Sequence, residues 1–293
     1  MGFLQHLING MYIGAIYAVI ALGYTMVYGI AKMLNFAHGD VIMVGAYISY
    51  SITSALGLGV IPGILAAMVV CTLLGILIEG LAYKPLRGTS SLAVLITAIG
   101  VSYFLQNGAQ LIWGPANISF DHILNVKPLS FFDGRVLVSA EAFLTLVVAV
   151  LVMVGLTLFV NKTKMGKAMR AVSEDRAAAQ LMGINVNRTI SVTFAIGSAL
   201  AAIAGVLLCS KVSSVYPTVG AMPGIRAFTA AVFGGIGSIP GAMLGGMLMG
   251  LIETFGSAYI DILPSDAIVF IVLIIILLVK PAGLLGKQVQ EKV

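Results

Sequence analysis

Charge is the scarcest property of this sequence. Of 293 residues, only 9% are Asp, Glu, Lys or Arg, whereas an ordinary soluble domain has roughly 25%. Hydrophobic residues make up 60% of the chain, and the mean hydropathy is +1.08. This composition argues against a soluble enzyme or a nucleic-acid-binding domain. We therefore predict an all-α polytopic membrane protein.

Cysteine and catalytic motifs are equally sparse. Cys71 and Cys209 both lie in apolar segments without a CxxC pair or a histidine cluster, which argues against a metal site or a disulfide. A phosphate-binding loop is missing, because Gly166 and Lys167 are followed by Ala168 and no glycine stands at the required upstream position. Neither an HExxH pattern nor a credible Ser, His and carboxylate set is present. We therefore expect no enzyme, no catalytic residue, no metal and no cofactor bound by this chain.

Long apolar segments mark the expected membrane spans. A helix crosses a bilayer core with about 20 apolar residues. Five segments come close to this length: 7–28, 61–83, 92–112, 142–160 and 190–210. Four others are shorter or interrupted: 41–56, 221–234, 241–259 and 265–279. We predict eight or nine transmembrane helices, some of them short or broken.

The basic residues lie in connecting segments rather than on one continuous face, so membrane orientation explains the net charge of +5 better than nucleic-acid binding does. With nine crossings, one side receives the six basic residues of 162–188 together with Lys32, Lys84, Arg87, Lys280, Lys287 and Lys292. The other side receives only Lys127, Arg135, Lys211 and Arg226. Because Lys and Arg are enriched in cytoplasmic loops, we predict a cytoplasmic loop at 161–189, an ordered outer loop at 113–141, an outer N-terminus and an inner C-terminus. With eight crossings, the basic residues would no longer gather on one side of the membrane.

Glycines at a spacing of four residues predict close helix packing. The pairs are Gly10 and Gly14, Gly241 and Gly245, and Gly246 and Gly250. Small residues four apart share one helix face and let two backbones approach closely. We favour a packing role over a pore-lining role for these glycines.

Two interruptions divide the apolar regions. Residues 33–40 read MLNFAHGD and residues 234–241 read GGIGSIPG. Irregular backbone at membrane depth is stable only beside protein or a water-filled cavity, and such breaks mark translocation paths in transporters. Each break precedes a segment that we predict to be a short helix, and the two helices would run in opposite directions. This arrangement is compatible with an inverted repeat, although no internal sequence similarity establishes one.

We assign a candidate translocation path to these breaks and to one acidic residue in a predicted span. The set is Asn35, His38, Gly39, Asp40, Gly235, Gly237, Ser238 and Glu253.

Structural roles compete with this assignment. Asp40 could cap the helix that follows it, and Asn35 could satisfy backbone groups of the loop. His38 lacks a paired carboxylate relay, so proton coupling has little support. Glu79 should be close enough to the inner interface to reach water. Glu253 lies deeper, where it either pairs with another side chain or lines the path.

The loop 161–189 is a polar island between two spans. Within it we predict one short helix over 173–183, capped by Ser173 and ended by a left-handed turn at Gly183. Glu174 and Asp175 would suit the positive end of its dipole. A folded helix in such a loop suggests a docking element. The residues that we expect to contact a partner are Lys167, Arg170, Glu174, Asp175, Arg176, Ala178, Ala179 and Gly183.

Three separated motifs carry a family resemblance. They are MLNFAHGDVIMVGAY at 33–47, RAVSEDRAAAQLMGI at 170–184 and FTAAVFGGIGSIPGAMLGG at 228–246. In this order they resemble the permease subunits of bacterial branched-chain amino acid ABC importers, and most closely the shorter, H-type subunit. The resemblance covers nearly the whole chain.

This resemblance implies a single permease domain over 1–293 in the bacterial inner membrane, where the charge bias would make the N-terminus periplasmic and the C-terminus cytoplasmic. It implies four partners: a second, M-type permease, two ATPase subunits that bind ATP, and a periplasmic binding protein that delivers leucine, isoleucine or valine. The polar island would correspond to the coupling helix, E-A-A-x-x-x-G, with Ala177 in place of the glutamate. Glu174 and Arg176 would then be the candidates for that contact.

Other functions stay open on the sequence alone. A related permease for urea, amides or other amino acids would share this architecture. A gradient-driven secondary transporter or channel would also fit the hydrophobic composition. An intramembrane enzyme has the least support, because no reactive set of residues is present.

Overall fold

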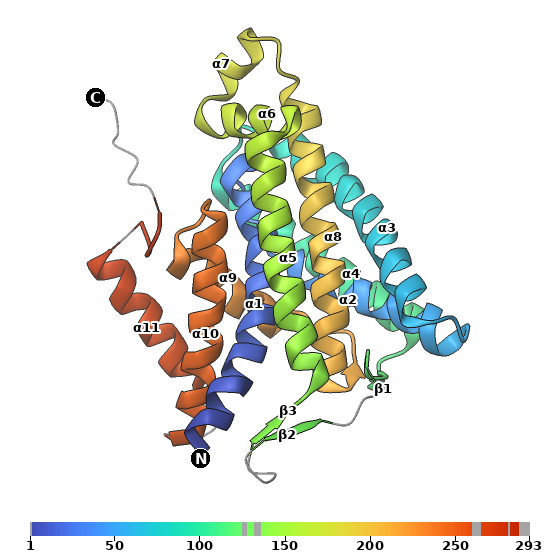
Figure 1. The fold of residues 1–293 in the computed structure, drawn as a ribbon. Helices are drawn as coiled ribbons and strands as arrows, with labels where there is room; N and C mark the ends of the chain where they lie inside the picture. The colour runs from blue at the N-terminus through green and yellow to red at the C-terminus, as the bar shows by residue number, and fades with distance from the viewer. Residues whose placement is uncertain (1, 125–127, 132–135, 260–264, 281, 287–293) are drawn as a thin grey trace. The chain divides into compact units, whose positions relative to one another are not determined.

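The protein is almost entirely helical (Figure 1). The structure, a computed structural model, describes residues 2–124, 128–131, 136–259, 265–280 and 282–286. The α-helices in this part of the chain are α1 (Gly2–Ala31), α2 (His38–Tyr50), α3 (Val60–Ile78), α4 (Ser91–Trp113), α5 (Ala140–Lys162), α6 (Lys164–Glu174), α7 (Arg176–Leu181), α8 (Val186–Val212), α9 (Ala221–Gly234), α10 (Ile239–Tyr259) and α11 (Ser265–Val279).

Short irregular elements connect these helices. A π-helical turn at Ser51–Ala55 continues α2, and a second one at Glu79–Tyr83, followed by a 3₁₀ turn at Lys84–Leu86, continues α3. The strands are β1 (Ile118–Ser119), β2 (Leu129–Phe131), β3 (Val136–Val138) and β4 (Ser214–Val215). Strand β1 pairs antiparallel with β4, and β2 pairs antiparallel with β3.

Nine of the helices coincide with the nine predicted apolar segments. Six of them are long and apolar enough to cross a membrane: α1, α3 with its continuation, α4, α5, α8 and α10. Helices α2, α9 and α11 have 13, 14 and 15 residues. At a rise of 1.5 Å per residue each is only about 20 Å long, and α2 with its π-helical turn is about 27 Å long, so all three are shorter than a hydrocarbon core of roughly 30 Å. The prediction of short helices is confirmed, and the number of complete crossings stays a prediction.

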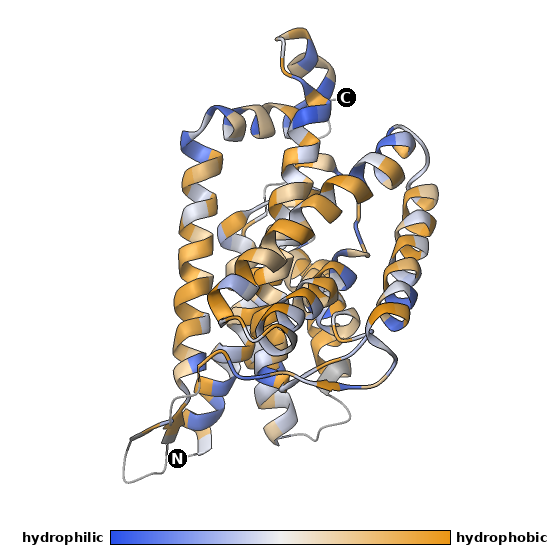
Figure 2. Ribbon diagram, turned by 90° about the vertical axis from the view of Figure 1, so that its right-hand side faces the viewer, coloured by the Kyte–Doolittle hydropathy of each residue, from blue (hydrophilic) through white to orange (hydrophobic). Residues whose placement is uncertain are grey.

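Hydrophobic and hydrophilic residues are separated along the chain (Figure 2). The long helices are hydrophobic along most of their length, and hydrophilic residues gather near helix ends and in the loop that carries α6 and α7.

The chain folds into two compact units, each built from separate stretches. Unit 1 comprises Met1–Thr25, Val126–Met153 and Arg226–Val293, and unit 2 comprises Met26–Asn125 and Val154–Ile225.

In unit 1, glycines bring the backbones of α1 and α10 together. A Cβ atom added at Gly14 would lie 2.8 Å from the Cα atom of Met247, and one at Gly246 would lie 2.8 Å from the Cβ atom of Ala18. Such distances are shorter than ordinary contacts, so only glycine fits without a shift of the helices. The predicted packing role of the four-residue glycine spacing is confirmed here.

In unit 2, helices α2, α3 and α8 form the packed core. Helix α8 is buried along much of its length. A Cβ atom at Gly45 of α2 would lie 2.6 Å from the Cα atom of Ala202 of α8. A second close approach joins the first turn of α2 to the segment before α9, because a Cβ atom at Gly39 would lie 2.6 Å from the carbonyl oxygen of Gly220.

Both predicted breaks are present. Helix α1 ends at Ala31, Lys32 adopts a left-handed backbone with φ of 53°, and α2 begins at His38. The second break separates α9 from α10, with positive φ at Gly235 and Gly237.

One detail of the predicted breaks is wrong. The helix after the second break, α10, has 21 residues, because a proline in a first helical turn does not interrupt a helix. The short helix of this region, α9, precedes the break instead. The inverted repeat stays a prediction, in which α9 rather than α10 would correspond in length to α2.

The predicted outer loop 113–141 contains β1, β2 and β3. Asp121 of this loop accepts a hydrogen bond at 3.1 Å from the hydroxyl of Ser54, which lies in the π-helical turn after α2. Its charged residues Lys127, Asp133 and Arg135 lie outside the described residues.

Candidate functional site

The polar island folds as two helices, not as the single helix predicted over 173–183. Asp175 has an extended backbone (φ of −151°), which ends α6, and its carboxylate accepts hydrogen bonds from the amides of Ala177 (2.8 Å) and Ala178 (3.0 Å). Asp175 is therefore the N-cap of α7. The prediction for Ser173 is wrong, since this residue lies in the last turn of α6 and donates to the carbonyl of Arg170 at 2.7 Å. Gly183 adopts the predicted left-handed conformation, with φ of 82°.

Helix α6 is an amphipathic helix that the sequence analysis did not identify. Thr163 caps it by accepting a hydrogen bond from the Gly166 amide at 2.9 Å. One face, formed by Gly166, Met169 and Val172, is buried. The opposite face carries exposed basic side chains: Lys164, Lys167 and Arg170. Their spacing of three residues, following a threonine, is the signal that could have revealed this helix.

Helix α7 ends in an exposed apolar tip. Leu181 is 89% exposed and Met182 is 82% exposed, which is unusual for apolar side chains in a loop this polar. We call these two residues the apolar tip. Of the predicted partner contacts, the exposed ones are Lys167, Arg170, Glu174, Asp175, Ala178 and Gly183. Arg176 is half-buried, and Ala179 is buried and therefore offers no surface.

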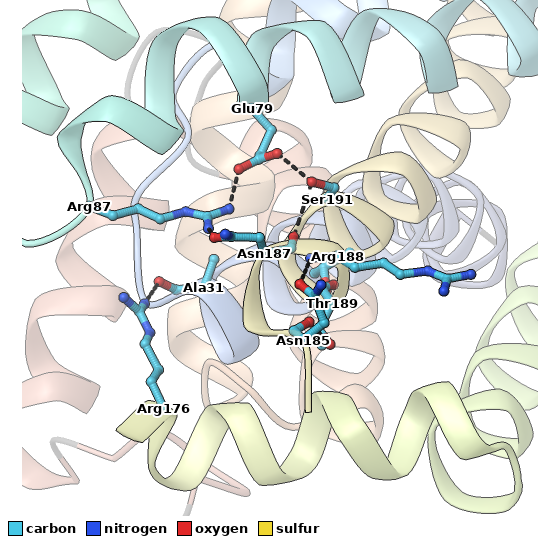
Figure 3. Close-up of polar contacts among 10 residues, drawn as sticks. Ala31, Glu79, Arg87, Arg176, Asn185, Asn187, Arg188, Thr189 and Ser191 are labelled. Carbon is cyan, nitrogen blue, oxygen red and sulfur yellow. Dashed lines mark hydrogen bonds and ion pairs between the residues drawn. The ribbon is translucent and has the colours of Figure 1, made fainter. Parts of the chain in front are cut away.

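A buried ion pair lies in the segment after α3, and hydrogen bonds link it to the start of α8 (Figure 3). Arg87 pairs with Glu79, whose side chain is 2% exposed, and also donates a hydrogen bond to Asn187. The Ser191 hydroxyl donates to the second oxygen of Glu79 at 2.6 Å. The prediction that Glu79 reaches water is wrong, because the chain turns at Lys84–Leu86 and returns Arg87 over the carboxylate. A buried carboxylate requires a cation, so the nearby Arg87 could have been predicted as its partner.

Arg176 extends from the start of α7 to the end of α1. Its guanidinium donates to the carbonyl oxygen of Ala31 (Figure 3). Burial, and then the neighbouring Arg87 guanidinium, lower the pKa of Arg176 from its usual value. A cation at the last carbonyls of a helix stabilises that helix by roughly 0.3–2 kcal/mol. Two cavities, of about 710 and 650 Å³, flank this side chain, and Arg176 and Ala177 line both of them.

The residues of the first break are buried in unit 2. Asn35, His38 and Asp40 are at most 5% exposed. Tyr83 donates its hydroxyl to Asn35 at 2.9 Å, and Gln106 donates its amide to Asp40 at 2.8 Å. The proposed cap is wrong, because α2 begins two residues before Asp40 and its N-cap has no side-chain hydrogen bond. Polar partners from other elements, which the sequence analysis missed, hold Asn35 and Asp40 instead.

The candidate residues in unit 1 fall into two places. Gly235, Gly237 and Ser238 form the second break, where the amide of Gly241 donates to the Ser238 hydroxyl at 3.2 Å. Glu253 lies about 20 Å further along α10, at 1.5 Å per residue.

Glu253 has two partners within unit 1. Arg226 donates to one of its oxygens at 2.6 Å and Tyr17 donates to the other at 2.7 Å. This geometry favours the pairing alternative for Glu253. The prediction of Arg226 as an outer-loop charge is wrong, because Arg226 lies in α9 and forms an ion pair.

Known proteins resemble this chain over almost its full length. The model of the family described as "Branched-chain amino acid transport system / permease component" matches residues 6–278. The permease protein BraD of Pseudomonas aeruginosa, named as part of a high-affinity branched-chain amino acid transport system, is 45% identical over 304 residues, covering 99% of this chain and 98% of BraD. The corresponding LivH of Escherichia coli K12 is 44% identical, with coverage of 99% and 98%.

A solved structure, PsaBC from Streptococcus pneumoniae in complex with Fab, has a similar fold. The TM-score is 0.50 at 16% sequence identity, with 95% of this chain and 92% of that chain covered. This likeness concerns the fold alone. The family match and the two full-length relatives together establish that the chain belongs to the branched-chain amino acid transport system permease family.

Proposed function

We propose that this chain is the H-type permease subunit of an ATP-driven importer of leucine, isoleucine and valine in a bacterial inner membrane. The observation that carries the proposal is the 45% identity, over nearly the whole length of both chains, to a permease of a high-affinity branched-chain amino acid transport system. Substrate would pass between this subunit and a second, M-type permease. A periplasmic protein would select and deliver it.

ATP is hydrolysed, in this proposal, by two partner subunits on the cytoplasmic side. The apolar tip supports this part of the proposal, because two apolar side chains that are more than 80% exposed are typical of a surface that a partner covers. The Asp175 cap and the left-handed Gly183 fix both ends of α7, so the tip is presented on a defined helical turn. The basic loop around α7 favours the cytoplasmic side, which gives a periplasmic N-terminus and a cytoplasmic C-terminus over nine crossings.

The test is reconstitution of the chain with the second permease, the ATPase subunits and the binding protein. We expect ATP-dependent uptake of leucine, isoleucine and valine into proteoliposomes. The chain alone should neither hydrolyse ATP nor transport. Flux driven by an ion gradient through the chain alone would favour the secondary transporter, and uptake of urea or amides in preference to these amino acids would favour the related permeases.

A variant pair tests the docking surface. The double substitution Leu181→Asp and Met182→Asp should abolish co-purification with the ATPase subunits, because two carboxylates would replace the apolar tip. Lys162→Asp is the matched control, since it also changes the charge by two, at an exposed position at the end of α5, and leaves α7 unchanged. Normal ATPase binding by the double variant would contradict docking through α7.

A further inference from the structure

The first residue of α7 contacts the last residue of α1. The last four carbonyls of an α-helix have no amide partner within the helix. At the end of α1, the carbonyl of Tyr28 accepts from the amide of Lys32 at 2.9 Å, and the carbonyl of Ala31 accepts from the guanidinium of Arg176. A side chain of the polar island therefore completes the end of a membrane helix (Figure 3).

The contacted carbonyl lies at the point where the chain changes direction. Lys32 follows Ala31 with φ of 53°, a left-handed backbone conformation that residues other than glycine rarely adopt. The irregular residues 32–37 then lead into α2, whose first turn carries the buried His38 and Asp40. A displacement of the Ala31 carbonyl is therefore a displacement at the hinge between α1 and α2.

The surroundings of Arg176 leave room for such a displacement. The flanking cavities are lined by the first turn of α7 on one side and by segments of α1, α4 and α8 on the other sides. Within the described part of the chain, Arg176 bonds to a backbone carbonyl, and the ion pairs found there do not include it. Its neighbour Arg87 is held by Glu79 and Asn187, so it repels Arg176 from a fixed position.

We propose that Arg176 is a positioning residue that transmits displacement of α7 to the hinge between α1 and α2. This inference rests on the proposed function, in which ATPase subunits move α7. The simpler role, in which Arg176 only satisfies a carbonyl, predicts an effect on stability but none on the coupling of hydrolysis to transport.

The first experiment measures ATP hydrolysed per leucine taken up by the complete reconstituted importer. Arg176→Ala should keep the apolar tip and ATPase binding but raise this ratio at least fivefold. Arg176→Lys, which retains a charged donor, should recover at least half of the loss. Arg188→Ala is the matched control, because it removes the same charge from an exposed side chain at the start of α8, outside the expected partner contacts, and should change the ratio less than twofold. An Arg176→Ala importer with the wild-type ratio would overturn the coupling role.

A second experiment does not depend on the folding of an Arg176 variant. Spin labels are placed on Lys32→Cys and Arg188→Cys, two exposed positions of unit 2, while Cys71 and Cys209 are buried and stay unlabelled. The distance between the labels should change when the assembled importer binds ATP, since the hinge moves relative to the start of α8. An unchanged distance overturns the proposal. If the wild-type chain binds no ATPase, the proposed function itself is refuted. If the importer works and its ratio of ATP hydrolysed per leucine is the same with and without Arg176, only the coupling role is refuted.

Discussion

The glycine contact between α1 and α10 allows a quantitative prediction for Gly14→Ala. The added Cβ atom would lie 2.8 Å from both the Cα atom and the carbonyl oxygen of Met247, about 0.6 Å inside the 3.4 Å at which ordinary contacts begin. Because both atoms belong to the backbone, the helices have to separate. Overpacking of this kind costs about 1–3 kcal/mol.

The matched controls are Gly108→Ala in α4 and Gly155→Ala in α5, where an added Cβ atom meets nothing within 4 Å. Alanine is favoured over glycine in a helix interior by about 1 kcal/mol, and this gain applies to all three substitutions. Gly14→Ala should therefore be less stable than either control by about 1–3 kcal/mol.

The assay is unfolding of the isolated chain in mixed detergent micelles on titration with SDS, followed by circular dichroism. Gly246→Ala, on the other side of the same contact, should behave like Gly14→Ala, because its Cβ atom would meet the backbone of Ala18. Equal stability of Gly14→Ala and Gly108→Ala would refute the close approach of the two helices.

Two further predictions concern the polar loop and its surroundings. Arg87→Ala leaves the buried carboxylate of Glu79 without its cation and should lower the free energy of unfolding by about 3 kcal/mol. The loss should be smaller when Glu79→Gln is combined with it. Additive losses in this double-mutant cycle would argue against the pair. Asp175→Ala removes the cap of α7 at a cost of about 1 kcal/mol, so the amides of Ala177 and Ala178 should exchange hydrogen roughly fivefold faster. Asp175→Asn should keep the wild-type exchange rate. Unchanged exchange in the alanine variant would contradict the capping role.

Hydrophobic segment length was enough to predict where the membrane helices lie. All nine apolar segments correspond to helices, because a run of apolar residues in this composition has no other stable way to satisfy its backbone. Glycine spacing on α1 and α10 likewise predicted a helix contact, since a small-residue face has few other uses in a membrane bundle. Gly183 was placed correctly in a left-handed turn because its position at the end of a helical stretch is a local signal.

Most of the errors concern polar side chains, because their partners depend on where the helices end and on how the helices pack. Ser173 and Asp175 can both cap a helix, and the choice between them depends on where α6 ends, which is fixed by its buried face. Asp40 was expected to bond locally, but Gln106 of another helix is its partner. Glu79 was expected to reach water because its position near the inner interface was considered without Arg87, which the turn at Lys84–Leu86 returns over the carboxylate. Local propensity identifies candidate groups, and the packing of helices decides which of them meet.

The meeting of Gly39 with Gly220 has a mechanical consequence. Two glycines in contact bring backbone against backbone, so no side chain at this point fixes the position of α2 against the chain leading into α9. Interlocked side chains, by contrast, would hold the two segments in one register, because the side chains of one pack between those of the other. A methyl group at either position would meet the backbone of the other, so alanine there would force the two segments of unit 2 apart.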